Sequence, residues 1–298
     1  MTNSPPCVYL LDGSSYIFRA FFALPPLSNS SGLPTNAIYG FTNMTLKFLK
    51  TYQPEYLAVL LDAGRETFRN QIYQEYKSNR PEAPPDLIPQ FPYIRKVLKA
   101  MNVAVMELQG YEADDLIATL AKHFSASGIQ VVIVSGDKDL MQLVADEVKL
   151  LDSGKDKWIG LDGVKEKFGV EPDKAVEVMG LMGDSTDNIP GVKGIGEKTA
   201  IALIQKYHTL ENLFDHLHEL EKSGLKGVER IRKALAAGKD AAFLSRELAT
   251  VRTDVPIQVA LEDLRYHGSR REKLQELFTE LEFTNLLKGL DSESTDKI

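Results

Sequence analysis

Aspartate residues close several of the apolar runs in this 298-residue chain, and that arrangement constrains the fold more than any other feature. The run VYLLD ends in Asp12, YLAVLLD ends in Asp62, and VVIVSGDKD carries Asp137 and Asp139. Short apolar runs of this kind indicate buried strands of a mostly parallel sheet. Ligands of open α/β sheets bind beyond the carboxyl ends of the strands, so we expect these aspartates to converge on one place.

The order of the elements predicts an α/β fold with a doubly wound, mostly parallel sheet. Strands are expected at residues 8–12, 56–61, 103–108, 129–136 and 148–152, with helical patterns between them. Helical patterns dominate from about residue 161. We therefore predict an α/β core over residues 6–172, a C-terminal helical domain over 173–287, and a disordered tail or linker over 288–298.

The composition is that of a soluble globular protein, with 43% hydrophobic and 26% charged residues. No apolar run approaches the ~18 residues that span a bilayer, and the N-terminus lacks the basic segment of a secretory signal. Cys7 is the single cysteine, so no internal disulfide is possible. These features favour a cytoplasmic location and no membrane partner.

The net charge of -7 does not exclude a nucleic-acid partner, because nine acidic residues fall into the strand-end runs and into the clusters YEADD and GDSTDN. Without those nine, 42 acidic residues become 33, against 35 basic residues, so the rest of the chain is slightly basic. An acidic site neutralised by cations can therefore coexist with DNA binding. The nine residues are Asp12, Asp62, Glu112, Asp114, Asp115, Asp137, Asp139, Asp184 and Asp187.

Gathered carboxylates need counter-charges, because two of them ~5 Å apart repel by roughly 3 kcal/mol at an effective dielectric of 20. Oxygen ligands without a cluster of cysteine or histidine suit two or more Mg²⁺ ions, for which Mn²⁺ can substitute, and argue against zinc. Two such ions could activate water for attack on phosphorus. Taken singly, each strand-end aspartate could instead end a strand or cap a helix.

A basic and aromatic stretch from residue 65 to 92 is too long for an ordinary connection and is rich in proline near its end. Its side chains suit contacts with a nucleic-acid backbone and stacking on bases. A solvated basic helix is the alternative. The residues in question are Arg65, Phe68, Arg69, Tyr73, Tyr76, Lys77 and Arg80.

The segment PGVKGIGEKTA places three glycines before a predicted helix that begins near Glu197. Free amides at a helix start attract phosphate, and glycines allow close approach of the backbone. The segment resembles a helix-hairpin-helix element that holds DNA phosphates through Gly191, Lys193, Gly194, Gly196 and Lys198. A tight turn between two packed helices is the alternative.

The runs LLDGSSYIFRAFF, LLDAGRETFRNQIYQEYKSNRP, GYEADDLIATLA, VSGDKDLMQLV and GLMGDSTDNIPGVKGIGEKTA together resemble the 5′ nuclease domain of bacterial DNA polymerase I and the wider flap endonuclease family. The resemblance covers about residues 6–285. It implies a PIN-like nuclease core, and a metal-dependent 5′-3′ exonuclease and flap endonuclease that acts on branched DNA in primer removal and repair.

The resemblance also implies roles for individual residues. The nine carboxylates would hold the metals, and residues 65–92 would form a helical arch that admits a 5′ single strand. Lys77 and Arg80 would face the scissile phosphate as catalytic residues. A K⁺ ion could bind at the hairpin. The other expected DNA contacts are Tyr16, Arg19, Phe22, Arg69 and Tyr76.

Several alternatives stay open at this stage. The chain is expected to be a monomer, either a stand-alone exonuclease or a module linked to a polymerase. A catalytically silent scaffold that binds metal and DNA is the main rival function. A small-molecule phosphatase fits poorly, because Asp12 is followed by GSS and not by a second aspartate two residues later.

Overall fold

A computed structural model describes residues 5–292, and its centre is a six-stranded sheet in the order β3-β2-β1-β4-β5-β6. Neighbouring strands are parallel, except that β5 and β6 pair antiparallel. The expected doubly wound, mostly parallel sheet is confirmed, and the sequence analysis missed only the short β6. The strands are β1 (Cys7–Asp12), β2 (Tyr56–Leu60), β3 (Ala104–Met106), β4 (Gln130–Val134), β5 (Val148–Asp152) and β6 (Lys157–Ile159).

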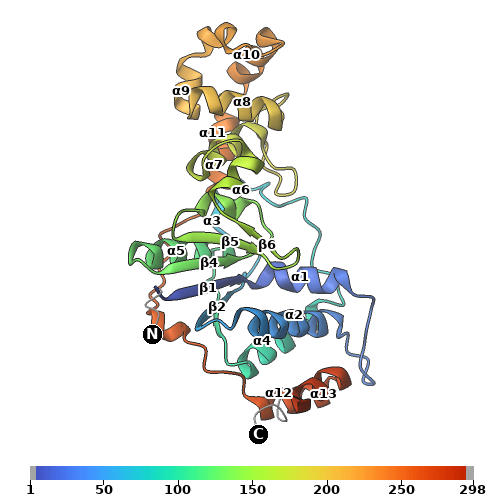
Figure 1. Ribbon diagram of the computed structural model, residues 1–298. Coiled ribbons are helices and arrows are strands. Elements are labelled where there is room, and N and C mark those ends of the chain that lie inside the picture. The colour runs from blue at the N-terminus through green and yellow to red at the C-terminus, as the bar shows by residue number, and fades with distance from the viewer. Residues whose placement is uncertain (1–4, 293–298) are drawn as a thin grey trace.

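Helices cover both faces of this sheet, so each face has its own apolar core (Figure 1). Along β1, Val8 and Leu10 face one core and Leu11 faces the other, which is the alternation of a pleated strand. One core contains α5 (Ala113–Ala126). The other contains α1 (Gly13–Ala23), α2 (Asn36–Tyr52) and α4 (Phe91–Ala100).

A stack of helices rises from the α5 face of the sheet (Figure 1). Its apolar side chains continue the core that contains α5. The stack is made of α6 (Leu161–Phe168), α7 (Pro172–Met182), α8 (Glu197–Tyr207), α9 (Leu210–Asp215), α10 (Val228–Ala237) and α11 (Lys239–Ala249).

The chain then returns to the opposite face, where α12 (Arg271–Glu280) packs beside α4 and is followed by α13 (Thr284–Ser292) (Figure 1). Leu274 and Phe278 are completely buried there. The prediction of one helical domain up to residue 287 is therefore wrong for this last part, because α12 completes the core of the α/β part. The predicted tail is helical over residues 288–292, and its remainder lies outside the described residues.

Residues 65–87, all of them described, contain one short helix, α3 (Phe68–Ile72), followed by turns. A 3₁₀ turn at Ile88–Gln90 leads into α4. The stretch is therefore neither a long solvated helix nor an arch built of helices. Across residues 5–292, no helix combines the length and the apolar character needed to cross a membrane.

Candidate metal centre and nucleic-acid interface

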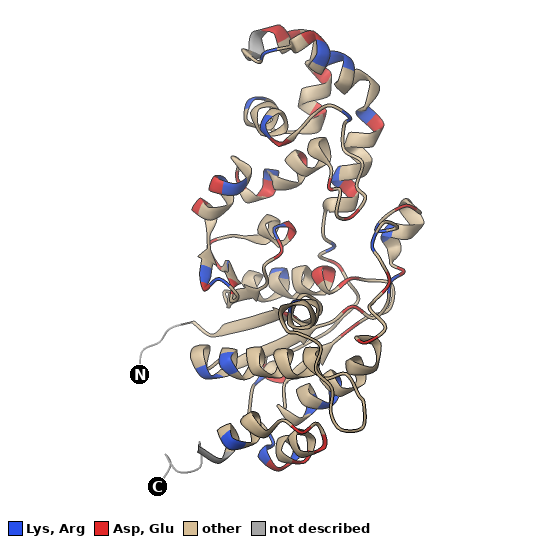
Figure 2. Ribbon diagram, turned by 90° about the vertical axis from the view of Figure 1, so that its right-hand side faces the viewer, with Lys and Arg blue, Asp and Glu red and all other residues tan. Residues whose placement is uncertain are grey.

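A cavity of about 410 Å³ lies at the carboxyl edge of the sheet and gathers six of the nine predicted carboxylates. They come from three strand ends, from the start of α5 and from the loop after α7. The expected convergence is confirmed for these residues, which are Asp12, Asp62, Glu112, Asp114, Asp137 and Asp187. Elsewhere in the molecule, acidic and basic residues are interspersed along the chain (Figure 2). The net negative charge is therefore not spread evenly as an excess of acidic residues.

Local hydrogen bonds fix the first carboxylates. Asp12 caps α1, because its Oδ1 accepts a hydrogen bond from the amide of Ser15 at 2.9 Å. Its Oδ2 accepts one from the Ser135 hydroxyl at 2.7 Å. Asp62 accepts a hydrogen bond from the first amide of α5, Ala113, at 2.8 Å. Each aspartate thus ends or follows a strand and also orients the start of a helix.

Basic side chains of the 65–92 stretch contact the other side of this cavity. Lys77 Nζ lies 2.8 Å from Glu112 Oε2 and 3.7 Å from Asp187 Oδ2. Arg80 donates a hydrogen bond to Asp187. Burial alone would lower the pKa of Lys77, but Glu112 and Asp187 outweigh it and raise that pKa, so Lys77 is a fixed cation.

Burial and mutual repulsion raise the pKa of three carboxyl groups. The pKa of Asp12 rises to about 6, because burial and the charges of Asp62 and Asp137 outweigh the hydrogen bonds from two serines. The pKa of Asp114 rises well above its ordinary value through burial and the charges of Asp12 and Asp137. For Asp139, burial and Asp137 raise the pKa to about 7. Ionisation of these carboxyl groups is therefore unfavourable, because the cations of the protein do not offset the cost of burying the negative charges together.

The donor set fits hard divalent cations. Every acidic ligand at the cavity is an oxygen, and Asp139 Oδ1 is buried without a hydrogen-bond partner. In the present side-chain arrangement of residues 5–292, no three acidic, histidine or cysteine side chains are placed to hold an ion together. Lys77, Arg80 and Lys138 instead contact the acids. Ion binding would therefore require small side-chain movements.

Asp139 and Asp184 do not line this cavity and lie beside it. Lys138 Nζ is 2.5 Å from Asp184 Oδ2 and 3.9 Å from Asp139 Oδ1. Burial would raise the pKa of Asp184, but hydrogen bonds from Lys138 and the Thr186 amide lower it. Lys138 thus contacts both residues, and the amide of Asp139 donates a hydrogen bond to Asp137 Oδ1 at 2.9 Å.

Asp115 is not available to a metal, which corrects the prediction. It is fully buried, and both of its oxygens accept hydrogen bonds at 2.8 Å from the guanidinium of Arg69. Arg69 is only 2% exposed, so its predicted contact with DNA is also wrong. A buried arginine and a buried carboxylate satisfy each other, and neither can then face a ligand.

Three more predicted DNA contacts are structural. Tyr16 is 1% exposed, and its hydroxyl pairs with Ser153. Tyr76 is 4% exposed and bonds Glu112. Gly191 is buried, and its amide donates to the Ser245 hydroxyl at 2.8 Å. Nucleic acid cannot reach these groups in the structure as it stands.

The remaining predicted contacts are accessible. Arg19 and Phe22 line the acid-lined cavity, and Phe22 is 71% exposed. Lys193 and Lys198 are exposed at the turn between α7 and α8, as are Gly194 and Gly196. The turn therefore presents basic side chains and open backbone at one surface.

The 65–92 stretch and the turn after α7 are joined by hydrogen bonds. The amide of Lys77 donates to the carbonyl of Asp187 at 2.9 Å, and Asn79 Nδ2 donates to the carbonyl of Ser185 at 2.7 Å. Asn188 Nδ2 donates back to the carbonyl of Glu75 at 2.7 Å. Residues 75–80 and 184–188 therefore form one connected structure.

Sequence reasoning missed several residues of the site. Ser14 and Ser15 line the cavity beside Asp12, and Ser135 bonds Asp12. Phe18 also lines it, one helical turn before Phe22. The four-residue spacing of the two phenylalanines was readable, whereas the Ser135 contact depends on the pairing of β1 with β4.

Two family models match the chain consecutively. The first, the N-terminal resolvase-like domain of 5′-3′ exonucleases, matches residues 7–169, and the second, their C-terminal SAM-fold domain, matches residues 170–272. This chain belongs to the 5′-3′ exonuclease family. A 5′-3′ exonuclease of Aquifex aeolicus is 44% identical over 285 residues, with 95% of each chain covered.

This chain is also similar to bacterial DNA polymerases I. The polymerase of Bacillus caldotenax is 43% identical over 97% of this chain, but this chain spans only 33% of that polymerase. The chain thus spans about a third of the length of the polymerases that it matches.

Solved structures share the fold. The 5′-exonuclease of bacteriophage T5, with bound divalent metal ions (zinc), superposes with a TM-score of 0.67 at 22% identity, covering 92% of this chain and 98% of that one. The catalytic core of Rad2 in complex with DNA substrate superposes with a TM-score of 0.61 at 15% identity, over 93% and 88% of the chains. At these identities the likeness concerns the fold.

Proposed function

We propose that this protein is a Mg²⁺-dependent, structure-specific 5′ nuclease that hydrolyses phosphodiesters at 5′ ends and flaps of branched DNA. The convergence of six carboxylates in a cavity that also receives Lys77 and Arg80 carries this proposal. When bound, two such ions supply an activated water and stabilise the leaving oxygen. Asp12, Asp62, Glu112 and Asp114 would hold one ion.

Around the second ion, Asp137, Asp139 and Asp187 are the proposed ligands, with Asp184 nearby. Lys77 and Arg80 would leave their present acidic partners and stabilise the charge that develops on the cleaved phosphate. Both side chains have raised pKa values and stay positively charged around neutral pH. They are therefore suited to electrostatic stabilisation and not to proton transfer. Arg19, Phe18 and Phe22 would contact the single strand at the rim of the cavity.

A cleavage assay on a 5′-flap DNA, with Mg²⁺ or with a chelator, tests the proposal. Asp114→Asn keeps the shape of a cavity residue but removes its charge, so we expect turnover to fall by roughly 100-fold or more while DNA binding persists. Asp146→Asn changes an exposed acid outside the cavity and should cleave normally. Binding without any Mg²⁺-dependent cleavage would instead favour the silent scaffold.

The turn between α7 and α8 is the proposed site for the downstream duplex. Neutralising about four phosphates there would give a slope of roughly -3.6 in a plot of log affinity against log salt. Lys193→Ala and Lys198→Ala should each make that slope shallower by about 1. Lys99→Ala, on α4 at the opposite face of the sheet from the helical stack, is the matched control. An unchanged slope in both test variants would move the duplex site elsewhere.

The other expectations follow from the same proposal. Mn²⁺ should substitute for Mg²⁺, and a K⁺ ion could occupy the turn near Gly194. DNA with 5′ flaps, nicks or duplex 5′ ends would be the partner of a monomeric protein in the cytoplasm, alone or joined to a polymerase module. Light scattering with and without flap DNA checks the monomer.

A further inference from the structure

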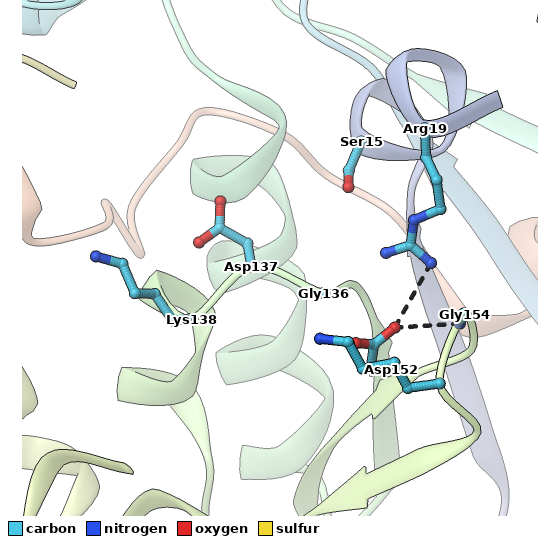
Figure 3. Close-up of a pocket in the computed structure, with 8 residues that line it drawn as sticks. Ser15, Arg19, Gly136, Asp137, Lys138, Asp152 and Gly154 are labelled. Atoms are coloured by element: carbon cyan, nitrogen blue, oxygen red, sulfur yellow. Dashed lines mark hydrogen bonds and ion pairs between the residues drawn. The ribbon is translucent and has the colours of Figure 1, made fainter. Parts of the chain in front are cut away.

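A second cavity, of about 670 Å³, adjoins the acid-lined one. Ser15, Arg19 and Asp137 line both, so the two are continuous. Figure 3 shows Ser15 and Arg19 projecting from α1 toward the loop after β4 and toward the hairpin that joins β5 to β6. This second cavity is not lined by the other predicted metal ligands.

Asp152 holds Arg19 at the wall of this cavity. Arg19 Nη1 lies 3.5 Å from Asp152 Oδ1, and the Asp152 side chain is 7% exposed against 28% for Arg19 (Figure 3). The same Oδ1 accepts a hydrogen bond from the Gly154 amide at 3.1 Å, which fixes the carboxylate. Lys155 Nζ also lies 3.3 Å from Asp152 Oδ2, but the Lys155 side chain is 78% exposed, so this pair contributes little. Asp152 is thus anchored by its own hairpin, and Arg19 is its longer and less exposed cationic partner.

Two glycines leave the space in which the guanidinium lies. A Cβ on Gly136 would lie 2.7 Å from Arg19 Nη2, and one on Gly154 would overlap Nη1. The ring of Tyr16, with its centroid 5.7 Å from Arg19 Cζ, borders the guanidinium as well. Because an arginine has five donors in a fixed plane, donors not directed at Asp152 can serve a ligand in the cavity.

We propose that Asp152 is a positioning residue that orients Arg19 to bind the DNA phosphate next to the one being cleaved. This inference rests on the proposed nuclease function. An arginine held by one carboxylate presents a planar fork that matches phosphate oxygens, and Lys138 and Lys155 line the same cavity. Asp152 itself ends the apolar run VKLLD, as Asp12 and Asp62 end theirs, but it faces a cation and not the metal site.

A scan with neutral linkages tests the role of Asp152. Single methylphosphonates are placed at successive positions of a flap strand, and single-turnover cleavage is measured with saturating protein. In the unmodified protein one linkage beside the scissile phosphate should slow cleavage roughly tenfold, the size expected for one charge-assisted contact. Arg19→Ala and Asp152→Asn should each be slow on unmodified DNA and insensitive to that linkage.

Coupling between the two residues separates positioning from a general structural effect. The variant Arg19→Ala with Asp152→Asn should be no slower than Arg19→Ala alone, because Asp152 acts through Arg19. Gly154→Ala, which displaces the guanidinium without changing any charge, should reproduce the loss and covers the case in which Asp152→Asn does not fold. Asp156→Asn in the same hairpin is the control and should match the parent protein.

The phosphate could belong to the strand interior or to a 5′-terminal monophosphate, and paired substrates separate these sources. A nicked duplex with a 5′-phosphate is compared with one that has a 5′-hydroxyl, beside the internal methylphosphonate series. Loss of the Arg19 effect in either series supports the subsite and identifies its source. Wild-type sensitivity to the neutral linkage in Asp152→Asn, or multiplicative losses in the double variant, would overturn it.

Failure of the nuclease proposal is seen separately. If the wild-type protein cleaves no substrate with Mg²⁺, that proposal is lost, and the same DNA set is read by binding affinity. A linkage-specific loss of affinity that disappears in both Arg19→Ala and Asp152→Asn would still support the pairing. An unchanged pattern in Asp152→Asn would reject it.

Discussion

The buried ion pair of Arg69 with Asp115 joins three segments that are distant in sequence. Arg69 lies on α3 and Asp115 on α5, and the Arg69 Nε donates to the carbonyl of Leu248 at 2.9 Å. The amide of Arg252 donates to Asp115 at 2.8 Å. At the scale of single residues, this pair connects the start of the 65–92 stretch to the segment that follows α11.

Removing one partner should cost far more stability than removing an exposed pair. We expect Arg69→Ala to lower the free energy of unfolding by about 3–5 kcal/mol, because Asp115 is left buried and charged. Asp254→Ala breaks the exposed pair with Arg252 and should cost about 0–1 kcal/mol. Urea unfolding followed by circular dichroism measures both. Equal losses in the two variants would contradict a structural role for Arg69.

At the scale of elements, the turn after α7 depends on two glycines that lie against each other. Both have positive φ, +69° at Gly183 and +60° at Gly191, and a Cβ on Gly191 would overlap the backbone of Gly183. Gly194 also has a positive φ, +91°, but a Cβ there meets nothing within 4 Å. The two positions therefore separate backbone strain from close packing.

Gly194→Ala should cost about 1–2 kcal/mol, which is the strain of a left-handed alanine. Gly191→Ala should cost that amount and about 1–3 kcal/mol more, because the turn must open to admit the methyl group. Thermal melting compares the two variants with the parent protein. If Gly191→Ala melts no lower than Gly194→Ala, the close approach of the two glycines does not limit stability.

The elements show what sequence alone could provide. Short continuous apolar runs and parallel topology located Asp12, Asp62 and Asp137 at one edge, because strand ends of such a sheet must meet. The burial of Arg69 and Tyr76 could not be predicted, since their partners, Asp115 and Glu112, lie at the start of α5 and are brought to them only by tertiary packing. For the same reason α12 was grouped with the helical stack, although its apolar face covers α4.

At the scale of the whole molecule, the acids of the cavity and the adjacent Asp139 oppose folding when no cation is bound. The pKa of Asp12 is raised from 3.8 to about 6 and that of Asp139 from 3.8 to about 7. A raised carboxyl pKa gives stability that is present below about pH 4 and is lost as the pH rises through the folded value. The contribution of these groups therefore falls between about pH 4 and pH 7.

The proposed Mg²⁺ should reverse that loss, because a cation at this site would bind the ionised carboxylates and displace their protons. We expect the increase in melting temperature caused by Mg²⁺ to be small at pH 5 and to grow up to about pH 8. Asp12→Asn should show a weaker dependence on pH, and Asp146→Asn the parental one. Differential scanning calorimetry at fixed ionic strength measures the effect, and a Mg²⁺ response independent of pH would count against the site.

The hydrogen bonds between residues 75–80 and 184–188 have a consequence for how a branched substrate would be sensed. The segment that touches Lys77 runs on within a few residues to Lys193. Binding of a duplex at the turn between α7 and α8 could then shift the backbone that positions Lys77 and Arg80 beside the acidic side chains. Binding of the duplex next to a flap would thus affect the position of Lys77 and Arg80, so that duplex binding and cleavage would be coupled.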